Sequence, residues 1–286
     1  MPASVPERLA VVTGATSGFG RAAAETLAVE GFDLFLVCRD RARAECAAAE
    51  IAARVPRVRI DLAIADLSEI DEVARASREI LAANRPIALL LNNAGAVFAF
   101  RRETADGIEE TFALNHLAYF QLTLRLLGQL RASASARVVN VASDAYSFAR
   151  GRFDFADYGA KRRYRPLRQY GLSKLANILF THELARRLAD TGVEAVAWSP
   201  RGLTATRFAY GAHWLAPPVM KLLGLFATRT EVAARGLVAL CLRDLARGQN
   251  GRFFCGDRVV DVPPCNDEDA RRLWDLSLGL VGIGGE

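Results

Sequence analysis

The sequence predicts an α/β protein with a single doubly wound parallel sheet and helices on both of its faces. Apolar runs of about four to seven residues alternate with helical patterns along most of the chain, as in strands that are buried on both sides. The 286 residues are 51% hydrophobic and 24% charged, which is enough apolar material for a large core. No internal repeat or low-complexity linker divides them. We therefore expect one domain over residues 1–286.

Each expected element follows from its own stretch of sequence. Apolar runs bounded by turn residues predict strands, and apolar residues that recur at helical spacing predict helices. Strands are expected at residues 9–13, 33–38, 57–63, 87–92, 137–142 and 193–199, and helices at residues 20–30, 41–54, 68–83, 106–131 and 167–191. Two irregular segments, residues 144–166 and 200–229, interrupt this alternation, and long loops in a compact domain usually have a function.

Composition and charge exclude several classes of protein. High hydrophobicity with a net charge of only +5 excludes disorder as the main state. No uncharged apolar run reaches about 18 residues, and residues 1–8 lack the apolar run of a signal peptide, so we expect no membrane anchor. Five cysteines without a C-x-x-C pair indicate a reducing compartment, the cytoplasm. Three scattered histidines predict no metal site, and the arginines form no aromatic-interleaved stripe for nucleic acid.

The first strand leads directly into a glycine-rich turn that opens the first helix. The turn reads Thr13-Gly14-Ala15-Thr16-Ser17-Gly18-Phe19-Gly20. Glycines let the backbone turn tightly and approach a pyrophosphate, which binds at the positive end of a helix. A tight turn without a ligand is the alternative. The expected cofactor-binding residues of this turn are Gly14, Thr16, Ser17, Gly18, Phe19 and Gly20.

The end of the second strand bears on the choice of cofactor. An acidic residue there accepts the ribose hydroxyls of NAD, but this chain has Cys38 in that place, followed by Arg39. An arginine can pair with the 2′-phosphate of NADP and stack on adenine, so NADP(H) is favoured over NAD(H). Asp40 keeps the NAD alternative open, unless it caps the next helix instead.

A tyrosine and a lysine four residues apart form the strongest local signal for chemistry. Tyr170 and Lys174 share one face of a predicted helix. A phenol with a pKa of about 10 is a poor acid or base at neutral pH, and a fixed cation nearby lowers that pKa. Ser143 ends a predicted strand, at the edge where open α/β sheets bind ligands. A surface helix pair and an ordinary turn serine are the alternatives.

Together these motifs resemble the short-chain dehydrogenase/reductase family, whose glycine spacing is G-x-x-x-G-x-G. The resemblance runs in order from residue 9 to about residue 206. Within the family the chain is similar to the retinol-dehydrogenase-like and WW-domain-oxidoreductase-like branch. That similarity rests on a long gap between Ser143 and Tyr170 and on VCRD at 37–40, GRFDF at 151–155, YGLSKLAN at 170–177 and ARRLWDLS at 270–277.

The resemblance implies a Rossmann fold and assigns further residues by position. The implied catalytic residues are Asn115, Ser143, Tyr170 and Lys174, with Asn115 supporting a water chain to the lysine. The implied cofactor contacts include Tyr170 and Lys174 as well as Asp66, Leu67, Asn92, Ala94 and Gly95. After the sixth strand this chain has SPRGLTAT at 199–206 where the family has Pro-Gly and then x-Val-x-Thr. The expected contacts there are Pro200, Gly202 and Thr204, with Thr206 as the alternative to Thr204.

The predicted function is that of an NADP(H)-dependent oxidoreductase. It moves a hydride between the nicotinamide and a carbonyl or alcohol carbon of an apolar small molecule, with Tyr170 as the general acid or base. Ser143 orients the oxygen, while Lys174 lowers the phenol pKa and holds the nicotinamide ribose. The expected substrate pocket consists of Phe98, Tyr146, Phe148, Phe155 and Trp214.

Two functional alternatives and one assembly follow from the same resemblance. A similar Tyr/Lys pair serves in reductases of carbon–carbon double bonds, and a sensor or scaffold would bind NADP(H) without turnover. In many relatives the helices that match residues 106–131 and 167–191 pair across a two-fold axis. A homo-oligomer, either a dimer or a tetramer, is therefore expected.

Overall fold

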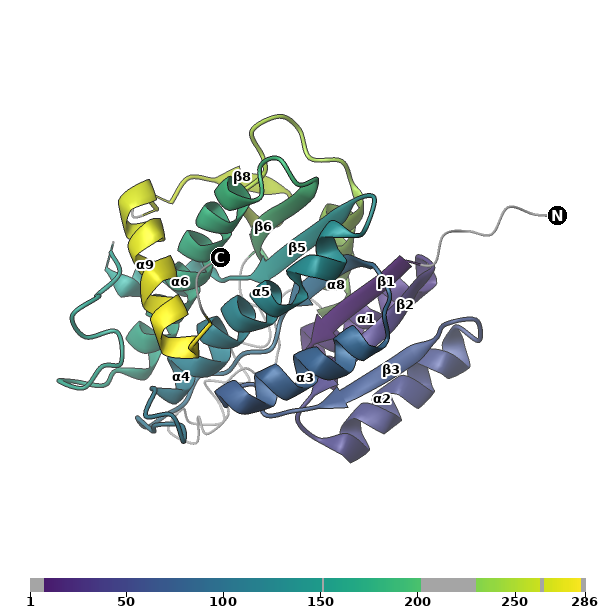
Figure 1. The fold of residues 1–286 in the computed structure, drawn as a ribbon, viewed down its shortest axis with the longest axis horizontal. Helices are drawn as coiled ribbons and strands as arrows, with labels where there is room; N and C mark the ends of the chain where they lie inside the picture. The colour runs from purple at the N-terminus through teal and green to yellow at the C-terminus, as the bar shows by residue number, and fades with distance from the viewer. Residues whose placement is uncertain (1–7, 151, 202–229, 263–264, 284–286) are drawn as a thin grey trace.

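The structure is a computed structural model that describes residues 8–150, 152–201, 230–262 and 265–283. Its centre is one eight-stranded sheet in the order β3-β2-β1-β4-β5-β6-β7-β8 (Figure 1). Neighbouring strands are parallel except for β8, which runs antiparallel to β7 at the edge. The strand order reverses between β1 and β4, which is where doubly wound folds bind ligands beyond the carboxyl ends of the strands. The predicted fold class is confirmed.

The strands are buried on both faces because their sequences are almost continuously apolar. Val11 and Leu36, for example, have no exposed surface. The bounds of the strands are β1 (Arg8–Thr13), β2 (Phe32–Cys38), β3 (Ile60–Ile64), β4 (Ile87–Asn92), β5 (Ala136–Val141), β6 (Val193–Ser199), β7 (Phe253–Cys255) and β8 (Arg258–Val260).

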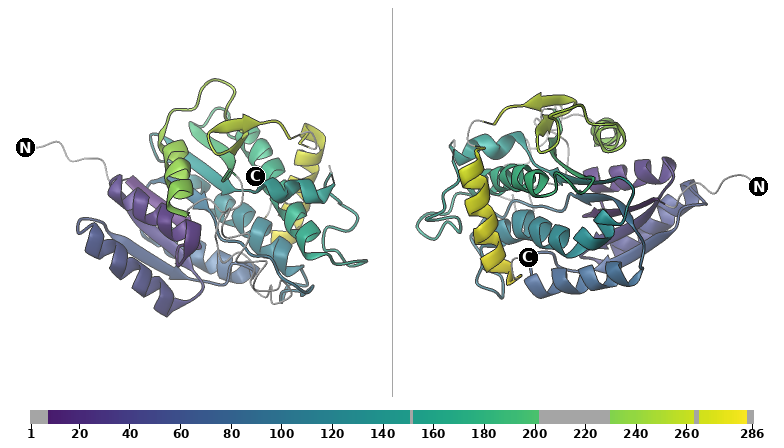
Figure 2. Two further views of the ribbon diagram at one scale, coloured as in Figure 1. Left: turned by 180° about the vertical axis from the view of Figure 1, so that it is seen from behind. Right: turned by 45° about the horizontal axis from the view of Figure 1, so that its top comes forward.

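Helices cover the sheet on both sides. Figure 1 shows α3, α5 and α6 in front of it, and the left panel of Figure 2 shows α1 and α8 behind it. The helices are α1 (Gly18–Val29), α2 (Arg41–Arg54), α3 (Ile70–Ala82), α4 (Glu110–Phe112), α5 (Ala118–Arg131), α6 (Pro166–Arg187), α8 (Thr230–Leu242) and α9 (Asp267–Val281). A π-helix, η1 (Ala113–Leu117), and a 3-10 helix, η2 (Asp144–Ala149), complete the described elements.

The predicted helix over residues 106–131 differs from the observed one. It begins at Glu110 and widens into the π-helix η1 before α5. Asn115 lies within η1, and π-turns of this kind are frequent at functional sites. Periodicity alone does not predict such a turn, because the extra residue is stabilised by contacts with other elements.

The C-terminal helix α9 packs across α5 and α6, as Figure 1 shows. Its Trp274 ring lies 5.0 Å from Phe120 of α5 and 6.0 Å from Phe180 of α6, measured between ring centroids. The Arg187 guanidinium lies over the Trp274 ring, 4.3 Å from its centroid. An aromatic cluster therefore fixes α9 on α5 and α6. Helix α6 carries Tyr170 and Lys174, and η1, which carries Asn115, leads into α5.

Candidate active site

The four residues that the sequence predicts as catalytic come together at the carboxyl edge of β4 and β5. Ser143 follows β5, Asn115 lies in η1, and Tyr170 and Lys174 lie one helical turn apart on α6. Because β4 and β5 are neighbours in the sheet, the loops after them meet at this edge. The fold thus gathers residues that are far apart in sequence.

Tyr170 is buried, with 2% of its surface exposed. Burial raises the pKa of its phenol well above the usual value, because the phenolate loses its hydration. A hydrogen bond with the Ser143 side chain acts in the opposite direction and lowers that pKa. Ser143 is held in place as the N-cap of η2, which packs along α6, and its Oγ accepts a 3.2 Å hydrogen bond from the Ala145 amide.

Lys174 is also 2% exposed, and its ammonium lies between two aromatic rings. Its Nζ is 5.6 Å from the ring centroid of Tyr170 and 5.4 Å from that of Tyr119, and it donates a 2.8 Å hydrogen bond to the Val141 carbonyl. Burial lowers the pKa of Lys174 to about 7. The group can therefore gain or lose its charge near neutral pH, which is the range useful for acid–base chemistry.

Asn115 connects the loop after β4 to the helix that carries Tyr170. Its amide donates to the Ala96 carbonyl at 2.9 Å, and its Oδ1 accepts from the Ala96 amide at 2.9 Å. The same amide donates to Ser173 Oγ at 3.0 Å, and the Ser173 hydroxyl donates to the Tyr170 carbonyl at 2.7 Å. Asn115 therefore fixes the backbone on both sides of the site.

Gly95 shows how closely these groups approach the loop after β4. A Cβ atom at this position would lie 3.0 Å from Asn115 Oδ1 and 3.6 Å from Lys174 Nζ. A side chain there would occupy the space beside the lysine ammonium. The glycine of the N-N-A-G motif is thus needed for close approach, and its backbone borders the predicted cofactor site.

Tyr119 is a site residue that the sequence reasoning missed. Its hydroxyl is fully buried and has no hydrogen-bond partner among the described residues. Burial, followed by the proximity of Tyr170, raises the pKa of this phenol. The available signal was its spacing, because Tyr119 follows Asn115 by one helical turn and so faces the same side.

The glycine-rich turn after β1 is braced by the loop after β4. The Thr13 hydroxyl accepts hydrogen bonds from the amides of Asn93 and Ala94 at 2.8 and 2.9 Å. The Asn93 side chain donates to the Thr13 carbonyl at 2.9 Å. Asn93 is a second residue that the sequence reasoning omitted, although it stands inside the N-N-A-G motif.

The N-terminus of α1 retains the features of an anion site. Gly14 has a φ of +71°, and a Cβ there would lie 2.9 Å from the Ala94 Cα, so only glycine fits this turn. Ser17, the N-cap residue, makes no side-chain hydrogen bond to the start of the helix, and the first turn holds no acidic residue. The amides of this turn can therefore bind phosphate oxygens.

The neighbouring segment after β2 carries the groups that distinguish the two cofactors. Cys38 is buried, which raises the pKa of its thiol to about 11 and keeps it neutral. Asp40 caps α2, its carboxylate accepting a 2.9 Å hydrogen bond from the Arg43 amide. Arg39 is exposed and lies 3.8 Å from the carboxylate of Asp66. Asp40, the acidic residue that left NAD(H) as an alternative cofactor, therefore serves as the helix cap.

Other predicted cofactor residues serve the fold with their side chains. The Asn92 amide is buried and donates to Thr123 Oγ1 at 3.0 Å and to Asn140 Oδ1 at 2.9 Å, which ties β4 to α5 and β5. Leu67 belongs to the core beside α3. The Phe19 ring stacks on Trp198 with centroids 5.0 Å apart. Thr16 is partly exposed in the turn, and Pro200 follows β6.

The described residues of the predicted substrate pocket each have their own packing partners. Phe98 is buried in the loop after β4, and its carbonyl accepts from the Tyr164 hydroxyl at 2.9 Å. Tyr146 packs edge-on against Phe253, whereas Phe148 is 49% exposed. Phe155 packs on Phe153 and beneath the Arg272 guanidinium of α9. Gly202, Thr204, Thr206 and Trp214 lie outside the described residues.

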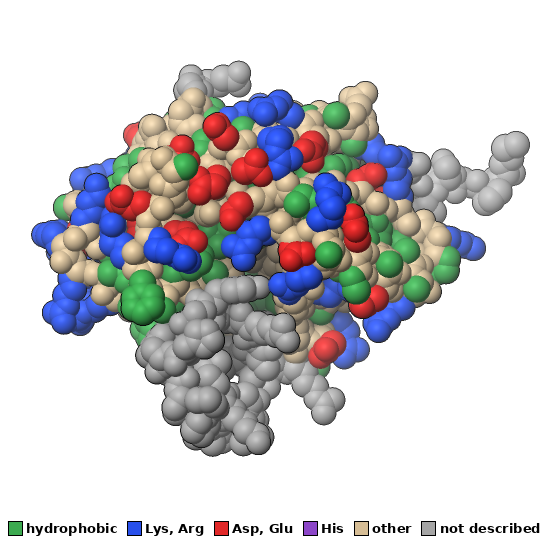
Figure 3. Space-filling model, turned by 90° about the horizontal axis from the view of Figure 1, so that it is seen from below, with side chains coloured by type: hydrophobic (Ala, Val, Ile, Leu, Met, Phe, Trp, Pro, Cys, Tyr) green, Lys and Arg blue, Asp and Glu red, His purple; other side chains and the backbone are tan. Residues whose placement is uncertain are grey.

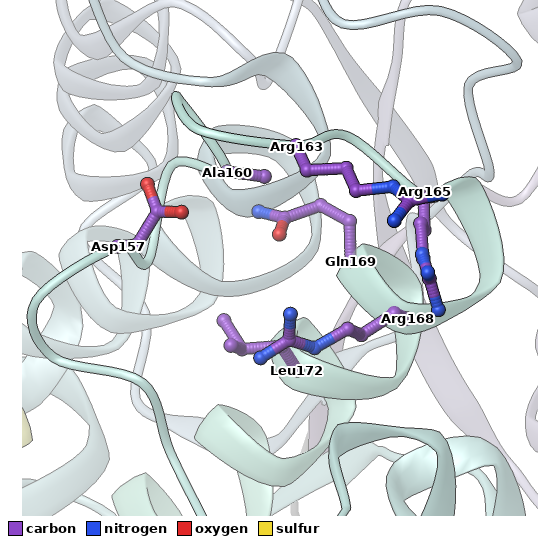
Figure 4. Close-up of a pocket in the computed structure, with 7 residues that line it drawn as sticks. All are labelled: Asp157, Ala160, Arg163, Arg165, Arg168, Gln169 and Leu172. Carbon is purple, nitrogen blue, oxygen red and sulfur yellow. The ribbon is translucent and has the colours of Figure 1, made fainter.

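A small pocket lies beside the start of α6. Figure 4 shows Arg163, Arg165 and Arg168 on one side of it and Asp157 on the other, with Ala160, Gln169 and Leu172 completing its lining. Its volume is about 10 Å³, which is the room that one water needs. This pocket is too small and too polar for an apolar substrate.

Surface charge, metal-binding side chains and apolar helices are the other features of the described residues that bear on ligands. On the face drawn in Figure 3, Lys and Arg side chains alternate with Asp and Glu. Among the described residues, no cluster of His, Cys, Asp and Glu could hold a metal ion. No helix in these ranges carries an apolar stretch that is long enough to cross a bilayer.

Comparison with known proteins identifies the family. Residues 8–212 match the model of the short chain dehydrogenase family. Mouse (Mus musculus) retinol dehydrogenase 12 is 35% identical over 281 residues, which cover 98% of this chain and 88% of that relative. Mouse retinol dehydrogenase 14 is 36% identical over 299 residues, with 99% and 88% covered. The chain belongs to the short-chain dehydrogenase/reductase family, in its retinol-dehydrogenase-like branch.

Solved structures agree with this fold. A putative uncharacterized protein from Mycobacterium paratuberculosis has a TM-score of 0.74 at 30% identity and covers 96% of this chain, with 93% of its own length matched. L-Sorbose reductase from Gluconobacter frateurii, solved with NADPH and L-sorbose, has a TM-score of 0.66 at 21% identity, with 87% and 95% covered. At that identity the second likeness supports the fold alone.

Proposed function

We propose that this oxidoreductase uses NADP(H) and interconverts a carbonyl and an alcohol on an apolar small molecule. The observation that carries the proposal is the buried Tyr170 phenol, which is bonded to Ser143 and lies beside the Lys174 ammonium at the carboxyl edge of the sheet. Bound NADP(H) supplies or accepts the hydride. Side chains of this chain transfer the proton and orient the substrate oxygen.

In the reductive direction Tyr170 donates its proton to the carbonyl oxygen of the substrate. The Ser143 hydroxyl, which already bonds the phenol, orients that oxygen and then stabilises the phenolate. The Lys174 ammonium lies over the Tyr170 ring and favours the phenolate by charge attraction. In the oxidative direction the phenolate takes the proton from the alcohol.

The residues of the cofactor site fit a dinucleotide with a 2′-phosphate. The Gly14 turn and the N-terminus of α1 would hold the pyrophosphate, and Lys174 the nicotinamide ribose. Arg39 would pair with the 2′-phosphate, because its guanidinium follows β2, its side chain is 58% exposed, and a guanidinium matches the geometry of a phosphate. The neutral Cys38 and the capping role of Asp40 leave the ribose hydroxyls of NAD without an acidic partner.

The class of substrate is supported by the relatives and by composition. Retinol dehydrogenases 12 and 14 are named for retinol, which is an apolar primary alcohol. The irregular segment over residues 144–166 places aromatic side chains, Tyr146 among them, directly after Ser143. We therefore propose an apolar alcohol and aldehyde pair, for which retinol and retinal are the first compounds to assay.

NADPH oxidation across a panel of one apolar aldehyde, one ketone and one enone tests this function. We expect turnover with the aldehyde or the ketone, with a strict preference for NADPH over NADH. Reduction of the enone at its carbon–carbon bond alone would assign the protein to double-bond reductases. Tight NADPH binding without turnover on any compound would instead make it a sensor or scaffold.

The predicted homo-oligomer remains a prediction, and one contact bears on it. The α5 and α6 surface that was expected at the two-fold axis is covered at Phe120 and Phe180 by Trp274 of the same chain. A dimer through this part of the two helices would require α9 to move. Light scattering at micromolar concentration measures the mass, and a monomer would refute the predicted homo-oligomer.

We also propose a reducing compartment, the cytoplasm, for this protein. The five cysteines are free, and two of them, Cys38 and Cys241, are buried in the core. Burial raises the pKa of Cys241 to about 12, so this thiol is unreactive. Fractionation of cells that express the tagged chain tests the compartment directly.

A further inference from the structure

A chain of buried polar side chains joins α9 to Asn115. His116 of η1, Asn177 of α6 and Ser277 of α9 each have no exposed surface. His116 Nε2 lies 2.9 Å from Ser277 Oγ, and His116 Nδ1 lies 3.2 Å from Asn177 Oδ1. The Asn177 amide donates a 2.8 Å hydrogen bond to the backbone carbonyl of Asn115. Three helices therefore converge on one carbonyl of the candidate active site.

The direction of these hydrogen bonds follows from their last member. A carbonyl only accepts, so the nitrogen of the Asn177 amide must face Asn115, and its oxygen must face His116. That oxygen also only accepts, so His116 carries its proton on Nδ1. A neutral imidazole then has a bare Nε2, which must accept from the Ser277 hydroxyl.

The imidazole is neutral because it is enclosed. Phe112, Phe120 and Phe180 lie with ring centroids 5.0, 6.3 and 6.1 Å from that of His116. Burial lowers the pKa of His116 to about 3, with the Asn177 contact opposing this shift. The hydroxyl of Ser277 has two acceptors within reach, Nε2 at 2.9 Å and the Leu273 carbonyl at 2.8 Å. If the Ser277 hydroxyl donates to Nε2, then Ser277, His116, Asn177 and the Asn115 carbonyl all have their hydrogen bonds satisfied.

The position of Asn115 controls the groups that surround Lys174. The Asn115 side chain bonds both backbone atoms of Ala96 and, through Ser173, the Tyr170 carbonyl. Asn115 lies in the π-helix η1. A π-turn is wider than an α-helical turn, and contacts with other elements stabilise it. The Asn177 bond supplies such a partner at the residue itself. A displacement of Asn115 would therefore move both the loop beside Lys174 and the helix turn of Tyr170.

We propose that Ser277, His116 and Asn177 are positioning residues, which hold Asn115 through the directed chain Ser277 to His116 to Asn177 to the Asn115 carbonyl. The C-terminal helix is thereby part of the catalytic support and not only a cover for α5 and α6. This inference rests on the proposed oxidoreductase function for its kinetic consequence. Its structural content, the direction of the chain, stands apart from that function.

Ser277→Ala is the kinetic test, and Ser77→Ala is its matched control. Both serines are buried in helices, with the hydroxyl oxygen 2.8 and 2.7 Å from the carbonyl oxygen four residues before, but only Ser277 also reaches His116. We expect Ser277→Ala to lower kcat by about 3- to 10-fold, the effect of weakening one hydrogen bond. We expect its Kd for NADPH to stay unchanged and the kcat of Ser77→Ala to equal that of the unmodified protein.

Nitrogen-15 NMR of the histidine rings tests the direction of the chain without any turnover. The chain has only three histidines, so loss of a signal in His116→Asn assigns that ring. We expect the Nδ1-protonated tautomer between pH 8 and pH 5, and a changed Nε2 resonance in Ser277→Ala. His116→Asn keeps an amide donor near the place of Nδ1, so it should retain more kcat than His116→Leu.

Different results overturn the two proposals. An Nε2-protonated His116, or equal kcat values for Ser277→Ala and Ser77→Ala, would exclude the positioning chain. Full activity of Tyr170→Phe would refute the proposed chemistry and leave the NMR result unaffected. If Ser277→Ala does not fold, the tautomer of the unmodified protein still decides the direction.

Discussion

The proposed catalytic end and the proposed adenosine end of the cofactor site lie along the same edge of the sheet but are built differently. At the catalytic end Tyr170 and Lys174 are 2% exposed, and burial shifts the pKa of both groups. At the adenosine end the side chains of Arg39 and Asp66 are 58% and 38% exposed. The first region fixes its groups through packing and directed hydrogen bonds, whereas the second presents charges to solvent. Proton transfer needs the former, and recognition of a phosphate needs only the latter.

The two helix N-termini at this edge show the same contrast. Helix α2 is capped by the Asp40 carboxylate, which satisfies the Arg43 amide. Helix α1 begins at Gly18, and its N-cap residue Ser17 makes no side-chain cap. A capped helix end has no need of an anion, but an uncapped one does. This difference supports the proposal that the pyrophosphate binds at α1 and not at α2.

Tyr170→Phe makes the strongest test of the catalytic end. The change removes one hydroxyl and keeps the ring, so turnover should fall by about 10²- to 10⁴-fold, the range for loss of general acid catalysis. NADPH affinity should barely change, because the phenol is not needed to hold the phosphates. Steady-state NADPH oxidation and a fluorescence titration of NADPH measure the two effects. Near-full activity would refute the mechanism.

Lys174→Arg tests whether the buried cation must be compact. A guanidinium is planar and larger than an ammonium, and the Lys174 Nζ is buried 5.4 and 5.6 Å from the ring centroids of Tyr119 and Tyr170. We expect a loss of about 10²-fold in turnover together with weaker NADPH binding. Arg125→Lys, a change on α5, serves as the control for a generic Arg/Lys exchange. Normal turnover in Lys174→Arg would show that only charge matters there.

Arg39→Ala tests the adenosine end. Removal of one charge-assisted contact to the 2′-phosphate should cost about 1.5–3 kcal/mol of NADPH affinity. NADH affinity and the kcat at saturating NADPH should stay unchanged, because the exposed region does not position the reacting groups. Calorimetric titration with both cofactors provides the measurement. Equal titration curves for NADPH and NADH in the unmodified protein would contradict the assignment to NADP(H).

A pH titration of stability distinguishes the buried region from the exposed one. The pKa of His116 is about 3 in the folded protein and near its usual 6.5 when the chain is unfolded. Between these values the unfolded chain binds a proton that the folded chain does not, so stability falls as the pH falls. The free energy of unfolding should drop by about 1 kcal/mol between pH 6 and pH 5 from this group. Urea unfolding at several pH values measures this effect. In His116→Asn the drop of about 1 kcal/mol between pH 6 and pH 5 should be absent, whereas Arg39→Ala should keep it.

Local patterns in the sequence were sufficient for the framework and for the order of the motifs. Helix α2 and the strands β4 and β6 have the predicted bounds, because their apolar periodicity and their flanking turn residues act over a few positions. The placement of Ser143, Tyr170 and Lys174 at one edge follows from the rule that parallel strands end together. The strands β7 and β8 were not predicted, since they have three residues each and depend on the sheet beside them.

The sequence by itself determined the fold class, the family and the residues of the Tyr/Lys pair, all of which depend on local spacing. Only the tertiary structure decided that Asp40 caps α2, that the Asn92 side chain ties β4 to β5, and that η1 widens around Asn115. It also brought Ser277 to His116 across 161 positions of sequence. Such contacts have no local signature, because each exists only after separate helices have packed and excluded water from the polar groups between them.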